Sequence, residues 1–348
     1  MSAPPTVSAI IVNWNGAAHL RICLPSLLAQ SYQPLEIIVV DNASSDDSLD
    51  VARQFGVRAL PLDRNTGLAW ALNRGTAAAT GDFFLFVNND MRFDEHFVAA
   101  LIAPLLRDQE IFATDGTQYD WDGKILGHAA SRLTRNRQQH HTAIEIVPGL
   151  YFYEQPEAEI VPAFMASCAS MLARRSHFEK LRGFDERLPF GYEDVEICWR
   201  AWLSGCKIVY VPNAICWHRV GASYQSEAGL SVHSAGVLKG RLALATKLLP
   251  RGYAFRTWLT ALAGLARDLA RLRGRSAAIR SKILAQYAAR IPAFLREKAA
   301  LYASAGTTAE KHLDFLLQIT GEEGRGVPSR GAAAPSARDR SSAIRSNH

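Results

Sequence analysis

The sequence predicts an α/β fold with helices on both faces of a doubly wound, mostly parallel sheet, followed by a helical, basic C-terminal extension. Three observations support this prediction. Apolar runs of strand length alternate with amphipathic segments up to Asp90, polar residues follow the ends of those runs, and the chain changes from acidic to basic near residue 239. Alternation at this spacing is typical of parallel strands joined by helices.

The elements follow one another as strand and helix units. Val7–Trp14 is a continuous apolar run ending in Asn-Trp-Asn-Gly, which indicates a buried strand and a turn. Leu35–Val40 is a second such run and leads into residues that favour helix N-caps. The same patterns predict helices over Ala18–Ser31, Asp47–Phe55, Gly67–Thr80 and Phe190–Ser204, and strands over Val57–Leu62, Asp82–Asn88 and Lys207–Val211.

Composition divides the chain into three parts. Residues 1–230 are predicted to form the α/β domain, with an irregular excursion between Asp115 and Glu159. Residues 231–320 are predicted to form the helical extension: Lys239–Lys298 contains fourteen Lys or Arg and two acids, whereas residues 1–238 carry a net charge of −7. Residues 321–348 are rich in Gly, Ala, Ser, Pro and Arg, which predicts a disordered tail.

Cysteine usage and the N-terminus bear on the compartment. The five cysteines lie in apolar stretches without a Cys-x-x-Cys pair, which indicates reduced core residues rather than a zinc or redox site. The first residues lack a basic region followed by an apolar one, and no uncharged apolar run approaches the ~18 residues that span a bilayer. We therefore expect a cytoplasmic protein that is soluble or peripheral to the membrane.

Polar residues at the predicted strand ends suggest a binding site for a nucleotide. In doubly wound sheets the ligand lies beyond the carboxyl ends of the strands, where Asn13, Asp41, Arg64 and Asn88-Asn89-Asp90 are expected. The carboxylate of Asp41 can accept from the imide N–H of uracil or thymine, and Arg64 can contact the base or a phosphate. Capping of the next helix is an equally good interpretation of Asp41 taken alone.

Two further positions can serve a metal ion. A hard cation that bridges two phosphates needs only one or two protein carboxylates, and Asp90 is suited to that role. His218, in Cys216-Trp217-His218-Arg219 at the end of the last strand, can meet the metal or a diphosphate. The simpler interpretations are a turn at Asn88-Asn89-Asp90 and a structural histidine.

Two adjacent acids enter a predicted helix at Gly191-Tyr192-Glu193-Asp194. Backbone donors at a helix N-terminus can hold one carboxylate, and the other then lies nearby in the cleft. A carboxylate held in this way can act as a general base. A surface capping acid is the alternative.

Taken in order, these segments resemble the family 2 glycosyltransferases of the GT-A fold, and in particular their rhamnosyltransferase-like bacterial branch. The resemblance covers roughly Val7–Ser223. It rests on residues 8–16 (Ser-Ala-Ile-Ile-Val-Asn-Trp-Asn-Gly), 39–44 (Val-Val-Asp-Asn-Ala-Ser), 65–67 (Asn-Thr-Gly) with Asn73, 81–90 from Gly-Asp to Asn-Asn-Asp, 183–186 (Gly-Phe-Asp-Glu) and 192–194 (Tyr-Glu-Asp).

The resemblance implies a role for each residue. Asp41 would recognise a pyrimidine with help from Arg64, Asp194 would be the catalytic base with Glu193 beside it, and Asp90 would bind Mg²⁺ or Mn²⁺. His218 matches a position that in some relatives touches the metal or the diphosphate. The donor would be bound by Asn13, Asp41, Arg64, Asn65, Gly67, Asn88 and Asn89. Asn88 replaces the first acid of an Asp-x-Asp motif, and this departure puts the metal affinity in question.

The implied activity is an inverting transfer of a sugar from a dTDP- or UDP-sugar to a hydroxyl of a glycan or lipid-linked glycan in cell-surface polysaccharide synthesis. dTDP-rhamnose is the first choice of donor, ahead of UDP-hexoses and a galactofuranose donor. A nucleotide-dependent oxidoreductase would need Gly-x-Gly-x-x-Gly after the first strand, and Asn13-Trp14-Asn15-Gly16 does not match it. A non-catalytic sugar-nucleotide or glycan-binding relative is the other alternative, although Asp90 and Asp194 argue against it.

The basic segment predicts an amphipathic helix with one apolar face. That face comprises Phe255, Trp258, Leu259, Leu262, Leu265, Leu269 and Leu272, with arginines interspersed. Packing on the α/β domain and contact with an anionic membrane through residues 239–298 are comparable interpretations, and the positive charge favours the membrane. Nucleic acid is not expected, because no known nucleic-acid-binding motif is present.

Overall fold

The computed structural model describes residues 3–124, 126–134, 144–147, 149–154, 160–188, 191–219 and 227–320. Within these ranges the strands of the main sheet are β1 Val7–Asn13, β2 Leu35–Asp41, β3 Arg58–Pro61, β4 Phe83–Asn88, β5 Met91–Phe93, β6 Ile111–Tyr119, β7 Leu126–His128, β11 Val161–Pro162, β12 Leu172–Arg174 and β13 Lys207–His218. A small second sheet contains β8 Ala130–Thr134, β9 Ile144–Val147 and β10 Gly149–Glu154. The predicted tail, residues 321–348, lies outside the described residues.

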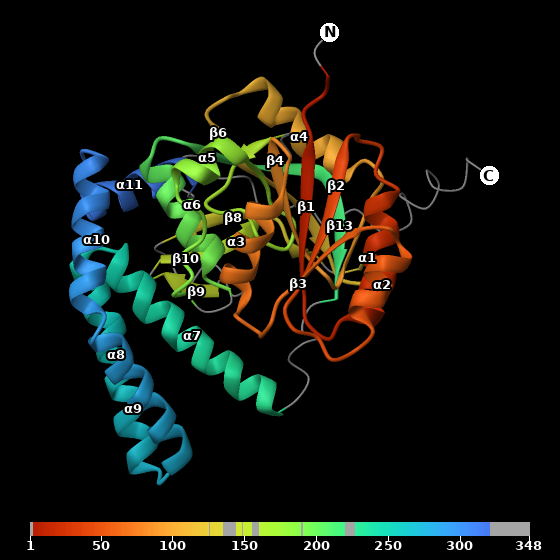
Figure 1. Ribbon diagram of the computed structural model, residues 1–348. Coiled ribbons are helices and arrows are strands. Elements are labelled where there is room, and N and C mark those ends of the chain that lie inside the picture. The colour runs from red at the N-terminus through yellow and green to blue at the C-terminus, as the bar shows by residue number, and fades with distance from the viewer. Residues whose placement is uncertain are drawn as a thin grey trace.

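The main sheet is mostly parallel (Figure 1). Its strand order is β11-β13-β6-β12-β4-β1-β2-β3, with β5 paired to β13 and β7 to β6. The pairs β1–β2, β1–β4, β2–β3 and β13–β6 are parallel, whereas β12 runs antiparallel to both β4 and β6. The carboxyl ends of β1, β2, β4, β6 and β13 therefore lie at the same edge of the sheet.

Helices cover both faces of this sheet. They are α1 Ala17–Leu28, α2 Ser48–Gln54, α3 Leu68–Ala78, α4 Phe97–Arg107, α5 Arg175–Lys180, α6 Glu193–Leu203, α7 Glu227–Lys247, α8 Arg251–Ala270, α9 Gly274–Ala288, α10 Ile291–Ser304 and α11 Ala309–Thr320. Successive strand residues point to opposite faces, so Ile11 joins a core with α1, α2 and α4 while Ile10 joins a core with α3, α5 and α6.

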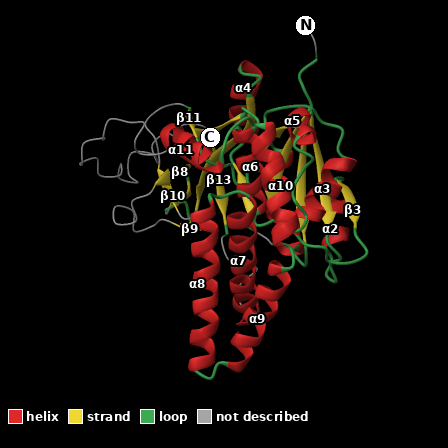
Figure 2. Ribbon diagram, turned by 90° about the vertical axis from the view of Figure 1, so that its left-hand side faces the viewer, coloured by secondary structure: helices red, strands yellow, loops and turns green. Residues whose placement is uncertain are grey.

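The C-terminal helices share the second of these cores. Leu242 and Leu244 of α7 are buried in the same hydrophobic cluster as Trp199 of α6. α8 and α9 form a hairpin that extends beyond the rest of the protein (Figures 1 and 2). None of the helices that the structure describes has an apolar stretch long enough to cross a membrane.

The structure differs from the sequence prediction at two strands. The predicted strand Lys207–Val211 is the first part of β13, which continues to His218 after a register shift between Val211 and Ile215. Pro212 lies in the shift, and a proline in a strand is tolerated at such an irregularity. β6 runs through Asp115, the residue from which an irregular excursion is expected, because its pairing with β13 continues from Ile111 to Tyr119.

Candidate active site

The edge formed by the strand ends brings together most of the predicted nucleotide-binding residues. Asn13 ends β1 and lies opposite Asp41, which ends β2, in the parallel ladder. The Asn13 Nδ2 donates to Asp41 Oδ1 at 3.1 Å, and the Asn89 Nδ2 donates to Asn13 Oδ1 at 2.7 Å. Gly16 makes this packing possible, because a Cβ there would lie 2.1 Å from the Asn89 side chain. A hydrogen-bonded row therefore joins three strand ends.

Asp41 closes a turn and does not cap a helix. Its Oδ2 accepts from the Ser44 N–H at 3.0 Å and its Oδ1 accepts from the Ser44 hydroxyl at 2.6 Å. The next helix, α2, begins only at Ser48. A carboxylate can accept about four hydrogen bonds, so these two contacts and the one from Asn13 leave acceptor capacity for a ligand.

The loop before α3 is tied to the same edge. Asn42 donates to Asn65 Oδ1 at 3.1 Å and accepts from the Thr66 N–H at 2.9 Å. Gly67 has φ +87° with nothing within 4 Å of a Cβ placed there, so the backbone conformation rather than crowding requires glycine. Arg64 is exposed at the start of this loop, and its guanidinium can approach a ligand on the edge.

Asp90 and His218 face each other across β5 and β13. The Asp90 Oδ1 lies 3.2 Å from His218 Nε2, and the two side chains are 11% and 16% exposed. Met91 pairs with His218 in the ladder, and the Arg219 N–H donates to the Asp90 carbonyl at 3.0 Å. One carboxylate and one imidazole, both partly exposed, fit a divalent cation whose remaining ligands are water and phosphate oxygens.

A stack of arginines and tryptophans borders this pair, and sequence reasoning missed most of it. The Arg92 guanidinium lies 5.1 Å from the Trp121 ring centre and 4.5 Å from that of Trp217, and Arg219 lies 4.6 Å from Trp121. The Arg92 Nη2 also donates to the Trp121 carbonyl at 3.0 Å. Two cations are thus held beside Asp90, where they favour binding of a polyanion. Only Arg219, adjacent to His218, carried a sequence signal.

Glu193 and Asp194 occupy the first turn of α6 and are 2% and 8% exposed. Glu193 Oε2 accepts from the N–H groups of Gly191 and Tyr192 at 2.8 and 3.0 Å. Asp194 Oδ1 accepts from the Val195 N–H at 2.7 Å, and the Cys168 N–H also donates to this carboxylate. The sequence placed these acids at a helix start, and their burial rules out the alternative of surface capping acids.

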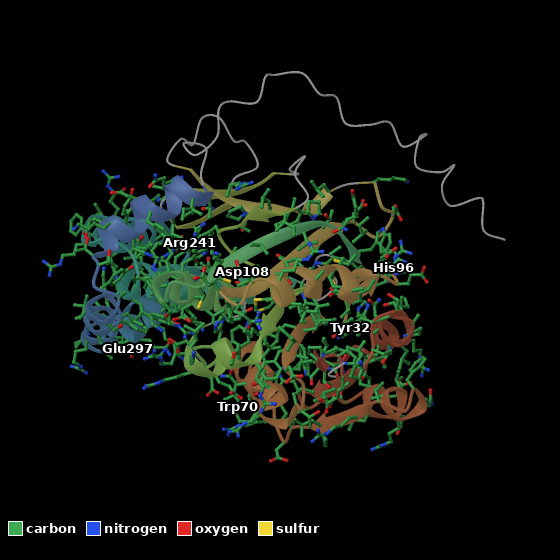
Figure 3. The ribbon with its side chains drawn as sticks, turned by 90° about the horizontal axis from the view of Figure 1, so that it is seen from above. Tyr32, Trp70, His96, Asp108, Arg241 and Glu297 are labelled. Atoms are coloured by element: carbon green, nitrogen blue, oxygen red, sulfur yellow. The ribbon has the colours of Figure 1, made fainter. Side chains whose placement is uncertain are left out.

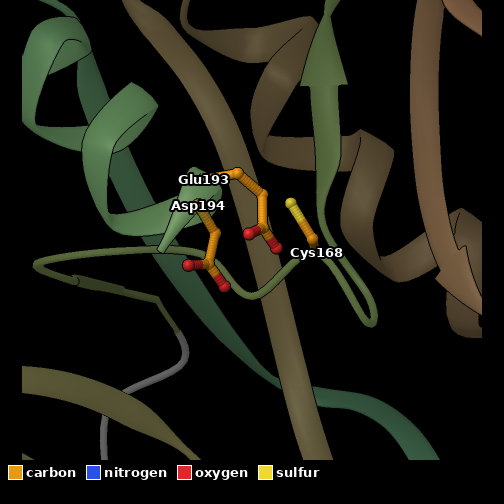
Figure 4. Close-up of side chains that lie close together, drawn as sticks. All are labelled: Cys168, Glu193 and Asp194. Atoms are coloured by element: carbon orange, nitrogen blue, oxygen red, sulfur yellow. The ribbon is translucent and has the colours of Figure 1, made fainter. Parts of the chain in front are cut away.

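Burial is the main electrostatic influence on this pair of acids. It raises the pKa of Asp194 against the opposing effect of the two backbone donors, and it raises the pKa of Glu193, to which the Asp194 charge adds. The Cys168 thiol completes the cluster, with ligand atoms of all three residues within 4.8 Å of one another (Figure 4). Because burial also raises the pKa of this thiol, the cluster is suited to holding a proton more than a hard cation.

A second buried pair, Asp115 and His128, supports Asp194 and was not foreseen. His128 Nε2 lies 2.6 Å from Asp115 Oδ2. Asp115 also accepts from the Ser167 N–H at 2.8 Å and the Ser170 hydroxyl at 2.7 Å, so it fixes the turn that supplies the Cys168 donor. The sequence signal that could have identified Asp115 is an acid inside an otherwise buried strand, because a buried charge requires nearby partners.

Ion pairs attach α6 to the C-terminal helices. Lys247 of α7 donates to Glu196 Oε1 at 2.6 Å and to Asp185 Oδ2 at 2.7 Å. Arg187 bridges Asp185 and Glu297, the latter labelled among the blue helices in Figure 3. This network holds the pKa of Asp185 well below its usual range, chiefly through Arg187 and Lys247 against the cost of burial. The helix that carries Asp194 therefore depends on α7 and α10 for its position.

Comparison with known proteins agrees with this arrangement. A family model described as "Glycosyl transferase family 2" matches residues 8–182. An N-acetylglucosaminyl-diphospho-decaprenol L-rhamnosyltransferase of Mycobacterium tuberculosis is 28% identical over 229 residues, which are 60% of this chain and 74% of that protein. A glycosyltransferase of Nostoc sp. is 36% identical over 213 residues, 59% of this chain and 58% of its own length.

Solved structures support the fold. A mannosyltransferase from Pyrobaculum calidifontis in complex with GDP-Man and Mn²⁺ superposes with a TM-score of 0.53 at 17% identity, covering 83% of this chain and 88% of that one. GalNAc-T7 with UDP, GalNAc and Mn²⁺ gives a TM-score of 0.55 at 18% identity, covering 80% and 54%. These similarities and the observed sheet confirm the predicted GT-A-like fold with its helical C-terminal region.

Proposed function

Because the chain belongs to glycosyl transferase family 2 and is a glycosyltransferase, we propose that it transfers a sugar from a nucleotide-diphosphate donor to an acceptor hydroxyl with inversion at the anomeric carbon. The observation that carries this proposal is Asp194. Its carboxylate is only 8% exposed, is held by backbone donors and has a raised pKa. Such a group combines fixed geometry with a useful affinity for a proton.

Asp194 acts as the general base. Its carboxylate takes the proton of the acceptor hydroxyl while that oxygen forms a bond to the anomeric carbon of the donor. The bond from this carbon to the diphosphate oxygen breaks on the opposite face, and the electron pair leaves with the nucleoside diphosphate. Glu193, whose pKa is also raised, stays protonated more readily than an ordinary glutamate and so limits charge repulsion in the pair.

The donor lies along the edge of the sheet. Asp41 and Arg64 contact the pyrimidine, and Asn13, Asn65, Gly67, Asn88 and Asn89 form the surrounding surface. The acceptor capacity left on the buried Asp41 carboxylate supports this assignment. Arg92 and Arg219, stacked on Trp121, offer positive charge to the diphosphate.

Asp90 and His218 would hold a Mg²⁺ or Mn²⁺ ion, which supplies positive charge to neutralise the departing diphosphate. Their separation of 3.2 Å and their partial exposure support this role. The solved structures with Mn²⁺ named above share the fold. Asn88 contributes no charge here, so we expect weaker metal binding than an Asp-x-Asp pair would give.

For the donor we propose dTDP-rhamnose, with UDP-hexoses and a UDP-galactofuranose donor as alternatives. The similarity to an L-rhamnosyltransferase that acts on a polyprenol-linked sugar supports this choice. By the same similarity we propose a lipid-linked glycan as acceptor, in cell-surface polysaccharide synthesis at the inner face of the cytoplasmic membrane.

The test is donor binding and hydrolysis with a panel of dTDP- and UDP-sugars, first with Mg²⁺ or Mn²⁺ and then with EDTA. We expect metal-dependent binding of one donor and slow release of its nucleoside diphosphate, lost in Asp194→Asn. Binding without hydrolysis in the wild type would favour a non-catalytic sugar-nucleotide-binding protein. No binding of any donor would refute the pyrimidine assignment.

A further inference from the structure

α8 exposes a continuous apolar stripe. Its large side chains are spaced by four, three and seven residues, which places them on one side of a helix. The stripe consists of Phe255 (68% exposed), Leu259 (54%), Leu262 (51%) and Leu269 (59%), with Leu272 (92%) directly after the helix. Exposed apolar side chains that gather on one face mark a contact surface, whereas isolated ones need no explanation.

Packing against the protein does not account for these side chains. Trp258 and Leu265, predicted on the same face, turn toward the core, and Trp258 Nε1 donates to Thr246 Oγ1 at 3.0 Å. Ala261 and Gly264 are buried on the other side of α8, where Gly264 allows close approach of the Arg280 side chain of α9. One face of α8 therefore packs on the core and on α9, and the other face has no protein against it among the described residues.

The charge around the stripe is all positive at the surface. Between residues 251 and 282 the exposed basic residues are Arg251, Arg256, Arg267, Arg271, Arg273, Arg275 and Lys282. The one acid in this stretch, Asp268, is 7% exposed and accepts from Arg280 Nε and Ser276 Oγ, both at 2.9 Å. A stripe of Phe and Leu flanked by arginines is typical of helices that lie in the interface of an anionic bilayer.

The turn between α8 and α9 supports the same conclusion. Leu272 has φ +53°, a left-handed conformation that helix ends usually give to glycine or asparagine. A leucine there is disfavoured both by its backbone and by its exposure, so stability of the fold does not explain it. Arg271 and Arg273 flank it. The turn therefore presents one exposed apolar side chain between two positive charges.

We propose that the exposed stripe of α8 and the Leu272 turn dock this protein on an anionic lipid bilayer, with the apolar side chains in the lipid and the arginines at the headgroups. A second copy of the chain is a poorer occupant, because it would bring two all-positive surfaces together. The hairpin extends toward the bottom of Figure 1, the side toward which β1 and β2 run. Docking there puts the membrane on the side of the proposed active site, as a lipid-linked acceptor requires.

The test is co-sedimentation of the full chain with vesicles of phosphatidylcholine alone or with about a third phosphatidylglycerol, without donor or acceptor. Binding is therefore measured independently of sugar transfer. We expect binding to the anionic vesicles, weaker binding to neutral ones, and loss at high salt. Leu272→Gly, which suits the positive φ and should leave the fold intact, should weaken binding about tenfold. Arg271→Gln should weaken it about fivefold.

Phe255→Ser combined with Leu259→Ser should abolish binding. The matched control is Leu28→Ser, which removes a leucine of similar exposure (48%) from α1 and should change nothing. No binding to anionic vesicles, or binding that the stripe variants do not affect, would overturn the proposal. So would a concentration-dependent dimer in sedimentation that the Phe255 and Leu259 changes dissolve, because a second copy would then cover the stripe.

Discussion

Replacing Asp194 with asparagine separates catalysis from folding in this protein. Asparagine keeps the size of the side chain and one oxygen that can accept from the Val195 N–H. In the wild type this N–H donates to Asp194 Oδ1 at 2.7 Å. It removes the proton acceptor that the reaction needs. Loss of a positioned general base costs ~10²–10⁴ in rate, which corresponds to about 3–5 kcal/mol of transition-state stabilisation.

Stability should change much less. One backbone donor loses part of its acceptor, which costs about 1–3 kcal/mol. The substitution also removes a buried negative charge beside Glu193, and this charge helps to raise the pKa of Glu193. The two effects oppose each other, so we expect the free energy of unfolding at pH 8 to stay within about 2 kcal/mol of the wild type.

The assay is release of nucleoside diphosphate from the bound donor, with donor affinity measured calorimetrically on the same preparation. Asp50→Asn is a suitable control, because it neutralises an exposed carboxylate that is paired with Arg53 on α2. Hydrolysis within threefold of the wild type would refute the role of Asp194 as base. Equal losses of hydrolysis and donor binding would assign it to the binding of the donor.

Three further predictions concern the surroundings of Asp194. Asp115→Asn should lower kcat about 10–100-fold at unchanged donor affinity, and the acid limb of the pH–rate profile should move to lower pH because Asp115 helps to raise the pKa of Asp194. If the acid limb of the profile does not move, Asp115 does not act on the pKa of Asp194 and serves only the fold. Lys247→Met should destabilise the protein by about 3–5 kcal/mol in urea unfolding, because it leaves a net negative charge among buried acids; an unchanged midpoint would contradict this. Glu193 has a raised pKa, so its contribution to stability is present below about pH 4 and is lost as pH rises through that pKa. Glu193→Gln should therefore gain stability relative to the wild type from pH 5 to 9, and a constant difference would count against the raised pKa.

The position of the predicted site followed largely from the sequence. Alternation of apolar runs and amphipathic segments specifies parallel strands joined by helices, and such a sheet brings its carboxyl ends to one edge whatever its details. Asn13, Asp41 and Asn89 consequently meet as expected, although they are far apart in the chain. The sequence proposed Asp90 and His218 as metal ligands, and the structure brings them within 3.2 Å through the pairing of β5 with β13.

The sequence by itself determined the fold class, the family resemblance and the helix-entry position of Glu193 and Asp194, because these depend on local patterns of a few residues. Only the tertiary structure decided what surrounds them. Asp115 and His128 lie on different strands, and the turn that they support comes from a third segment. The two faces of α8 likewise share one amphipathic pattern, and only the packing of α9 and the core distinguishes the buried residues from the exposed ones. The surroundings of the two acids and the exposed face of α8 depend on contacts between segments that are far apart in the chain. Local sequence patterns do not specify which of these segments come into contact.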